Sequence, residues 1–179
     1  MSSNDGLLGR VLRLESVAAI HALKSRYAAL ADAKYTRDFQ RVSDQRMEEV
    51  AWQQALCFTD DAVWFGGEFG GDRRGREQLH EWFQHSPWRF ATHLYAGPEL
   101  EVSDDHAQGR WRLWQLALPE DRDGTVLLTG TTRETYRRTA DGAWLIASMA
   151  FEDVQMMQAT HSTHPLVHRL SDLPGFNAR

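Results

Sequence analysis

Apolar residues recur every three or four positions along the first part of the chain. Ile20, Leu23 and Tyr27 belong to one such stripe. This spacing predicts an amphipathic helix over residues 11–33, with the stripe facing the protein interior. The preceding residues 1–10 are small, polar and glycine-containing, so we expect a flexible N-terminus there.

Two further helices and a short strand are predicted before the middle of the chain. A stretch without glycine or proline predicts a helix over Arg37–Phe58, which ends at the turn-forming residues 59–61. The apolar run Ala62–Phe65 predicts a strand. A third helix is expected over Arg74–His85, because apolar side chains line one face and Pro87 prevents its continuation.

The rest of the chain has the composition of β-structure. Runs rich in Val, Leu, Thr, Tyr and Trp are linked by SDDH, PEDRDG and TADG, and they cover residues 88–102, 107–118, 125–138 and 143–156. Consecutive strands joined by short links imply an antiparallel meander. Helices followed by strands predict an α+β fold, with a curved antiparallel or mixed sheet wrapped around three N-terminal helices. We expect one domain over 11–157 and a C-terminal tail over 158–179.

Composition narrows the class of protein. The chain has 179 residues, which suits one domain, and 20 basic against 25 acidic residues give a net charge of −5. This balance argues against a general nucleic-acid binder. No apolar run approaches the ~20 residues of a membrane span, and no signal-peptide pattern begins the chain, so a cytoplasmic protein is expected. The single Cys57 excludes an internal disulfide and a cysteine-cluster metal site.

Three residue types could carry chemistry, although the common catalytic motifs are missing. The chain lacks a G-x-S-x-G elbow, a P-loop and an H-E-x-x-H motif. His93 lies inside a strand among large apolar residues, where it either belongs to the core or faces a cavity. Tyr27 lies on the buried stripe of the first helix, and Asp32 lies near the end of that helix, where a carboxylate is mildly unfavourable.

Together these groups suit removal of a proton beside a carbonyl, followed by elimination or double-bond migration. A histidine exchanges a proton near neutral pH, a carboxylate fixes its tautomer, and a phenol can donate to a carbonyl or a departing hydroxyl. Each of the three, taken alone, is more simply an ordinary core or surface residue. Periodicity does not bring them together.

Several blocks of sequence resemble the SnoaL-like group of the nuclear-transport-factor-2-like superfamily over about residues 13–156. These blocks are IHALKSRYAALAD, FTDDAVWF, RRGREQLHEWF, THLYAGPELEV, RWRLWQLAL and ETYRRTADGAWLIASMAF. The resemblance implies a cone-shaped, cystatin-like α+β barrel with a pocket between the curved sheet and the helices. It also implies a chain that works without a cofactor and self-associates, as a dimer or trimer.

The resemblance also implies site residues. Members similar to bile-acid dehydratase carry a Tyr and an Asp five residues apart on the first helix, and a His at the start of the strand after the third helix. Tyr27, Asp32 and His93 occupy those places. Two features depart from the family: the strand RLWQLALPE lacks the second histidine of scytalone dehydratase, and IASMAFEDV lacks an arginine that several members have. Either Arg112 or Arg133 holds a developing oxyanion instead, or no such charge develops.

The resulting expectation is a cofactor-independent, dehydratase-like lyase or isomerase that acts on a hydrophobic, ring-containing, oxygenated small molecule. His93 would be the general base or acid, Asp32 its orienting partner, and Tyr27 the donor to substrate oxygen. Large side chains are expected to form the pocket wall, namely Trp64, Tyr95, Trp111, Trp114 and Phe151.

Other functions remain open at this stage. The fold also serves non-catalytic small subunits of ring-hydroxylating dioxygenases and ligand-binding proteins, in which the three candidate groups would be coincidental. Histidines in the tail could conceivably bind a metal, namely His161, His164 and His168, but their spacing in a proline-containing segment favours a cap over the pocket or a subunit contact. No metal and no membrane or nucleic-acid partner is expected.

Overall fold

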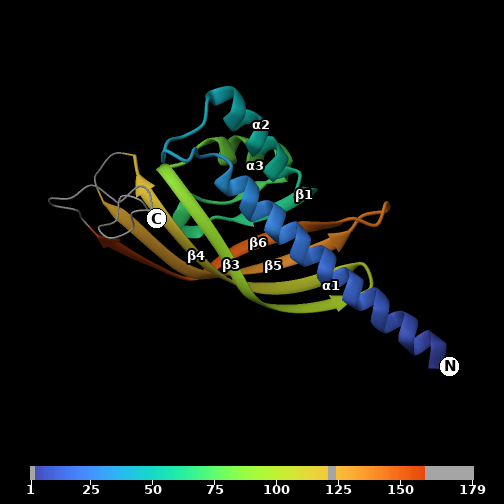
Figure 1. Cartoon of the computed structure of the whole chain (residues 1–179). Coiled ribbons are helices and arrows are strands. Elements are labelled where there is room, and N and C mark those ends of the chain that lie inside the picture. The colour runs from blue at the N-terminus through green and yellow to red at the C-terminus, as the bar shows by residue number, and fades with distance from the viewer. Residues whose placement is uncertain (1–2, 121–123, 160–179) are drawn as a thin grey trace, which may run out of the picture.

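The computed structural model describes residues 3–120 and 124–159, which form helices followed by strands (Figure 1). In chain order the elements are α1 (Ser3–Asp32), α2 (Asp44–Ala55), β1 (Phe58–Phe65), the 3-10 helix η1 (Gly67–Phe69), β2 (Arg73–Arg74), α3 (Gly75–Gln84), β3 (Trp88–Ser103), β4 (His106–Pro119), β5 (Thr125–Arg138) and β6 (Trp144–Ala159). Within these ranges, no helix is both long and apolar enough to cross a lipid bilayer.

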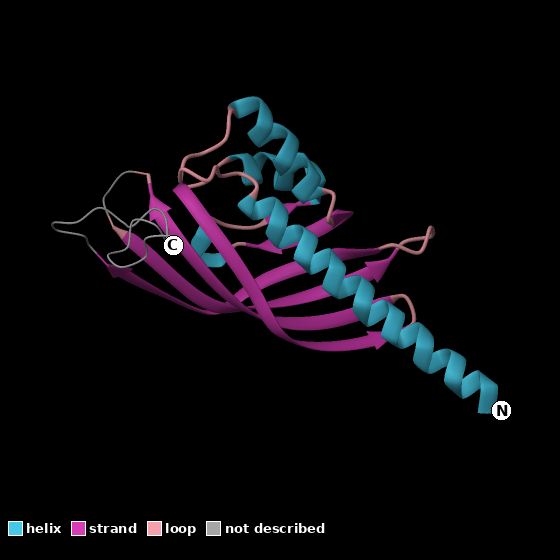
Figure 2. Ribbon diagram, viewed as in Figure 1, coloured by secondary structure: helices cyan, strands magenta, loops and turns pink. Residues whose placement is uncertain are grey.

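The strands form one curved, mixed sheet in the order β2-β1-β6-β5-β4-β3. All neighbours pair antiparallel except β1 and β6, which pair parallel. The α-helices of the described chain lie on one face of this sheet, and α1 runs across it (Figure 2). The predicted α+β architecture, with a curved mixed sheet around three helices, is confirmed.

Strand periodicity decides which side chains face the helices. Along β4, buried and exposed residues alternate over most of the strand, so Trp111 and Leu113 point inward while Arg112 and Trp114 point outward. The inward residues pack against α1 and α3, where Ile20 and others are fully buried. Ala51 and Ala55 of α2 join the same cluster, so the core fills the space between the sheet and the α-helices.

Helix α1 begins at Ser3, earlier than the predicted start at residue 11. Its first turns extend beyond the sheet (Figure 1), and Leu7, Leu8 and Leu14 on them are exposed. Gly6 and Gly9 each destabilise a helix by about 1 kcal/mol relative to Ala, but they do not interrupt α1 because strong helix formers surround them. Residues 3–10, which the sequence analysis assigned to the N-terminal segment, are therefore part of α1.

The second helix is shorter than predicted. Helix α2 covers Asp44–Ala55, whereas the prediction covered residues 37–58. The side chain of Ser43 accepts a hydrogen bond from the Arg46 backbone N–H at 3.4 Å and so caps the helix. The residues between α1 and this cap form a loop in which Tyr35 and Arg41 pair through an isolated antiparallel β-bridge.

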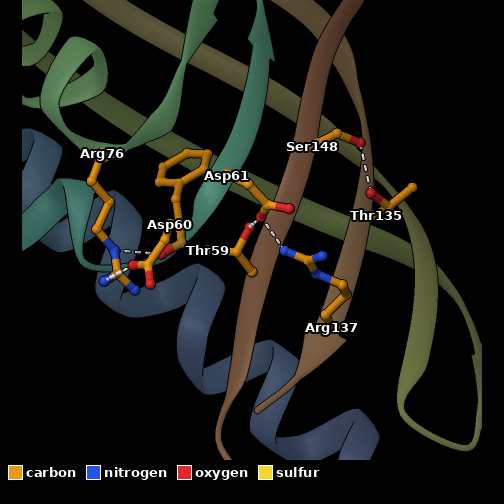
Figure 3. A network of polar contacts seen from close by, with 8 residues as sticks. Thr59, Asp60, Asp61, Arg76, Thr135, Arg137 and Ser148 are labelled. Atoms are coloured by element: carbon orange, nitrogen blue, oxygen red, sulfur yellow. Dashed lines mark hydrogen bonds and ion pairs between the residues drawn. The ribbon is translucent and has the colours of Figure 1, made fainter.

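Residues 59–61 belong to strand β1 and not to a turn. The pairing of β1 with β6 shifts in register between Phe58 and Val63, which lets the two acidic side chains face outward. Asp60 forms an ion pair with Arg76 of α3, and Asp61 accepts a hydrogen bond from Arg137 of β5 (Figure 3). Asp60 and Asp61, which resemble a turn signal in the sequence, thus each bind an arginine from a neighbouring element.

A buried ion pair joins α1 to the centre of the sheet. The Lys24 ammonium, 1% exposed, contacts the Glu134 carboxylate, which is fully buried. Glu134 also accepts hydrogen bonds from the hydroxyls of Thr132 and Tyr136, and Tyr136 in turn accepts one from the Trp111 indole at 2.8 Å. Burial lowers the pKa of Lys24, and the charge of Glu134 opposes this effect.

Replacing Lys24 with Met should destabilise the protein strongly. The substitution leaves Glu134 charged and buried without its cation, which typically lowers the free energy of unfolding by about 3–5 kcal/mol. The double variant Lys24→Met/Glu134→Gln should recover part of this loss, because Gln carries no charge and its amide oxygen still accepts from one of the two hydroxyls. Urea denaturation of the three proteins measures these differences, and a Lys24→Met protein as stable as the parent contradicts the assignment.

Candidate active site

A cavity of about 180 Å³ lies between the helices and the inner face of the sheet. Helix α1 contributes Tyr27 and Ala31 to its wall, and these residues lie about one helical turn apart on one face. Strand β3 contributes His93 and Tyr95, which are two residues apart and therefore both face inward. The cavity is thus lined by groups from distant parts of the chain.

The Asp32 carboxylate joins the end of α1 to β3. Its Oδ1 accepts hydrogen bonds from the His93 backbone N–H at 3.0 Å and from His93 Nδ1 at 2.8 Å. Its Oδ2 accepts from the Thr92 hydroxyl at 3.1 Å. A carboxylate at a helix C-terminus is unfavourable with the helix dipole, and these three donors offset that penalty.

The same contacts fix how the His93 ring presents itself. Because Nδ1 faces Asp32, the ring donates its Nδ1 hydrogen to the carboxylate, and the lone pair of Nε2 is free to accept a proton. The His93 side chain is only 16% exposed and lines the cavity. A positioned imidazole backed by a carboxylate is the arrangement of a general base.

Tyr27 supplies a phenol to the same cavity. Burial raises its pKa well above the ordinary value, with a further contribution from Glu134, so the hydroxyl stays protonated at neutral pH. The polar side chains of Gln54 and Tyr95 oppose this rise in pKa. The ring packs edge-on against Phe58, with a centroid distance of 5.7 Å.

Flat side chains form most of the remaining wall. Trp64, Tyr95 and Phe151, all expected in the pocket, do line it. Trp64 and Phe151 contact each other with ring centroids 5.4 Å apart. Further aromatic residues that sequence reasoning left out of the pocket also line it, namely Tyr35, Phe69, Trp82, Phe83 and Trp88.

Two predicted wall residues lie elsewhere. Trp114 is 53% exposed on the outer face of the sheet, opposite the cavity. Trp111 faces inward but packs edge-on against His21 and hydrogen-bonds Tyr136, away from the cavity lining. The two tryptophans are an odd number of residues apart on one strand, so they cannot both face the pocket.

The cavity also contains polar residues that the sequence did not single out. Gln115 lies beside His93 in the β3–β4 register, and strand alternation could have identified it as an inward residue. Gln54 comes from α2, and its Oε1 atom is buried without a partner among the described residues. Lys34 follows the end of α1, and no local pattern marks it.

The arginines considered as oxyanion partners do not reach the cavity. Arg112 is exposed on the outer face of β4, and Arg133 is 65% exposed and paired with Glu152. Among residues 3–120 and 124–159, no cluster of His, Cys, Asp or Glu has the grouping of a metal site. The tail histidines His161, His164 and His168 lie outside the described residues.

Removing the Asp32 carboxylate should release the His93 ring. In an Asp32→Ala variant the hydrogen on Nδ1 loses its acceptor, so the tautomer with hydrogen on Nε2 becomes populated. Nitrogen-15 NMR of the imidazole measures the tautomers at a pH where the ring is neutral. The control is Asp44→Ala, an exposed carboxylate on α2. Unchanged His93 tautomers in Asp32→Ala contradict the proposed orientation.

Comparisons with known proteins agree with this architecture. Among solved structures, a hexachlorocyclohexane dehydrochlorinase of LinA type 3 from Novosphingobium barchaimii is 23% identical, with a TM-score of 0.64, over 86% of this chain and 97% of that one. A scytalone dehydratase-like protein from Novosphingobium aromaticivorans is 16% identical, with a TM-score of 0.64, over 85% and 91% of the two chains. A nuclear-transport-factor-2-like protein with a cystatin-like fold from Novosphingobium aromaticivorans is 19% identical, with a TM-score of 0.64, over 84% and 90%.

Sequence comparison identifies the family. A search among curated protein sequences finds no significant match. The sequence profile of the SnoaL-like domain matches residues 12–150, which include both helices and strands of the cavity. The chain belongs to the SnoaL-like domain family.

Proposed function

We propose that this protein is a cofactor-independent lyase or isomerase of the dehydratase type, acting on a hydrophobic, ring-containing, oxygenated small molecule. The observation that carries the proposal is the Asp32–His93 pair, whose imidazole lines an aromatic cavity together with Tyr27. The LinA and scytalone dehydratase-like neighbours share the fold, and their names support a lyase as the reaction class.

The reaction begins at His93. Nε2 takes a proton from a carbon next to a carbonyl, and the negative charge of Asp32 stabilises the imidazolium that forms. The electron pair of the broken C–H bond forms a carbon–carbon double bond as the bond to a neighbouring hydroxyl breaks. The departing hydroxyl takes the proton from Nε2 of the His93 imidazolium and leaves as water, which restores the neutral imidazole. In an isomerisation, His93 returns the proton to another carbon instead.

Tyr27 is the donor to substrate oxygen. Tyr27 lines the cavity, so its hydroxyl can donate to a carbonyl or a departing hydroxyl of a bound molecule. The high pKa keeps the phenol neutral, which suits a hydrogen-bond donor at neutral pH.

The wall explains the preference for ring systems. Trp64, Phe83 and Phe151 present flat apolar surfaces, which favour a planar ring over a flexible polar chain. A bound ring displaces water from around His93 and Asp32. Their electrostatic interaction with the reacting atoms is stronger in that less polar surrounding.

Replacing His93 with Gln should remove most of the activity and leave the fold intact. A well-placed proton-transfer group contributes about 10²–10⁴-fold to the rate, so kcat should fall by that factor. The assay incubates the protein with a panel of cyclic β-hydroxy ketones and follows water loss by mass spectrometry and the absorbance of the conjugated product.

The matched control is His106→Gln, an exposed histidine at the far end of β4. It should keep the parent rate. If a substrate is found and His93→Gln turns it over at the parent rate, His93 is not the base. If ligands of this panel bind with the same affinity to parent and variant and none reacts, the protein is a binding protein of the same fold.

Self-association is a second part of the proposal, and the outer face of the sheet supports it. Leu94 pairs in register with Trp114, and Leu116 pairs with Leu127 on the adjoining strand. Leu94, Trp114 and Leu116 are 62%, 53% and 41% exposed, which makes a continuous apolar area on the convex side. A second copy of the chain would cover such an area.

Replacing Trp114 with Glu should shift the oligomer toward monomers, because it places a charge in the middle of this area. Sedimentation velocity measures the mass of parent and variant. The control is Trp52→Glu, a 38% exposed tryptophan on α2, which should leave the mass unchanged. A parent that sediments as a monomer overturns this part of the proposal.

A further inference from the structure

Lys34 is a buried cation in the wall of the cavity. It lies two residues beyond the end of α1 and is 7% exposed. The backbone carbonyl of Lys34 accepts a hydrogen bond from the Val42 N–H at 3.0 Å. The neighbouring Tyr35 forms an isolated antiparallel β-bridge with Arg41. The backbone that carries the side chain is therefore held on both sides, and the side chain faces the same space as His93 and Tyr27.

The ammonium of Lys34 lacks the anion that buried lysines normally require. Within the described residues it makes no ion pair or hydrogen bond, and its Nζ lies 5.0 Å from the centroid of the Phe83 ring. Lys24, the other deeply buried lysine, contacts the Glu134 carboxylate. Burial, with a smaller contribution from Arg41, lowers the pKa of Lys34 to about 7. An anionic ligand would complete the missing pair.

Lys34 is the one lysine or arginine side chain in the described cavity wall. The remaining lining residues include no lysine or arginine, and the two arginines first considered for an oxyanion, Arg112 and Arg133, face away from the cavity. The negative charge of Asp32 is already engaged by His93 and Thr92. Lys34 is thus the wall residue best suited to attract an anion.

We propose that Lys34 is the anion-recognition residue of the cavity, and that its ammonium binds a carboxylate or other anionic oxygen carried by the ring-containing substrate. The inference rests on the proposed function, because it names the substrate class of the same site. The ring would pack against the aromatic wall, while the anionic group points to the end of the cavity where Lys34 and Phe83 meet.

Binding should then depend on pH in a defined direction. The ammonium form binds the anion, so affinity falls as the pH rises through about 7, where Lys34 loses its proton. A bound anion raises the pKa of Lys34, so in the complex the ammonium loses its proton at a higher pH than in the free protein. Other titratable or charged groups around this cavity are Tyr27 and Asp32 on α1, Tyr35 and Arg41 in the following loop, Glu120 after β4, which forms an ion pair with Arg41, His85 after α3, and His93 on β3.

The experiment measures the dissociation constants of 2-naphthoate and of its neutral analogue 2-naphthamide by titration calorimetry between pH 6 and pH 9. The parent should prefer the naphthoate by about tenfold at the acidic end, the size expected of one charge-assisted hydrogen bond, and lose that preference as the pH rises. Lys34→Met should remove the preference and its pH dependence, with little change in the affinity for the amide.

His93→Gln separates this inference from the proposed reaction. That variant should keep the preference and its pH dependence, because anion binding does not need proton transfer. If the preference disappears in His93→Gln and persists in Lys34→Met, the imidazole is the anion site and the inference is overturned. Equal naphthoate binding by parent and Lys34→Met overturns it as well, and neither outcome bears on whether His93 transfers protons.

Folding gives a readout that needs no ligand. Lys34→Met removes a buried charge without a partner, so it should leave the melting temperature unchanged or raise it. The ordinary pKa of 10.5 applies in the unfolded chain, so the unfolded chain binds more protons than the folded chain between about pH 7 and 10.5. The stability of the parent relative to the variant should therefore rise with pH across this window. A variant that is destabilised equally at every pH contradicts a buried unpaired amine.

Discussion

The Asp32 carboxylate is the contact on which the site depends. Asp32 is the last residue of α1, and its carboxylate accepts hydrogen bonds from the backbone and ring of His93 and from the Thr92 hydroxyl. These bonds hold the end of the helix against β3 and fix the imidazole in one orientation. Because the same helix carries Tyr27 five residues earlier, the contact also sets where the phenol lies relative to the imidazole.

Two buried lysines show how differently one residue type can be used in a single core. Lys24 is neutralised by Glu134, in a network that Thr132 and Tyr136 complete, so it stabilises the packing of α1 on the sheet. Lys34 has no such anion among the described residues and lines the cavity. A structural charge is paired within the chain, whereas an unpaired one beside a cavity is suited to a ligand.

Local periodicity predicted the order of elements, the three helices and the inward face of α1, because these depend on neighbouring residues. The ends of α2 were missed although Ser43 is a recognisable cap, and an acidic pair in β1 resembled a turn because its arginine partners are distant in sequence. The Asp32–His93 contact spans 61 residues, so only the family resemblance suggested it. Nothing near Lys34 in the sequence signals burial, since Phe83 of α3 covers it.

The most direct test of the account is a crystal structure of the protein with a cyclic ketone bound. The account predicts the ring among the aromatic side chains of the cavity, the ketone oxygen within hydrogen-bond distance of the Tyr27 hydroxyl, and the carbon next to the carbonyl facing Nε2 of His93. A ketone seated outside the cavity, or one separated from Nε2 by packed side chains, would contradict it.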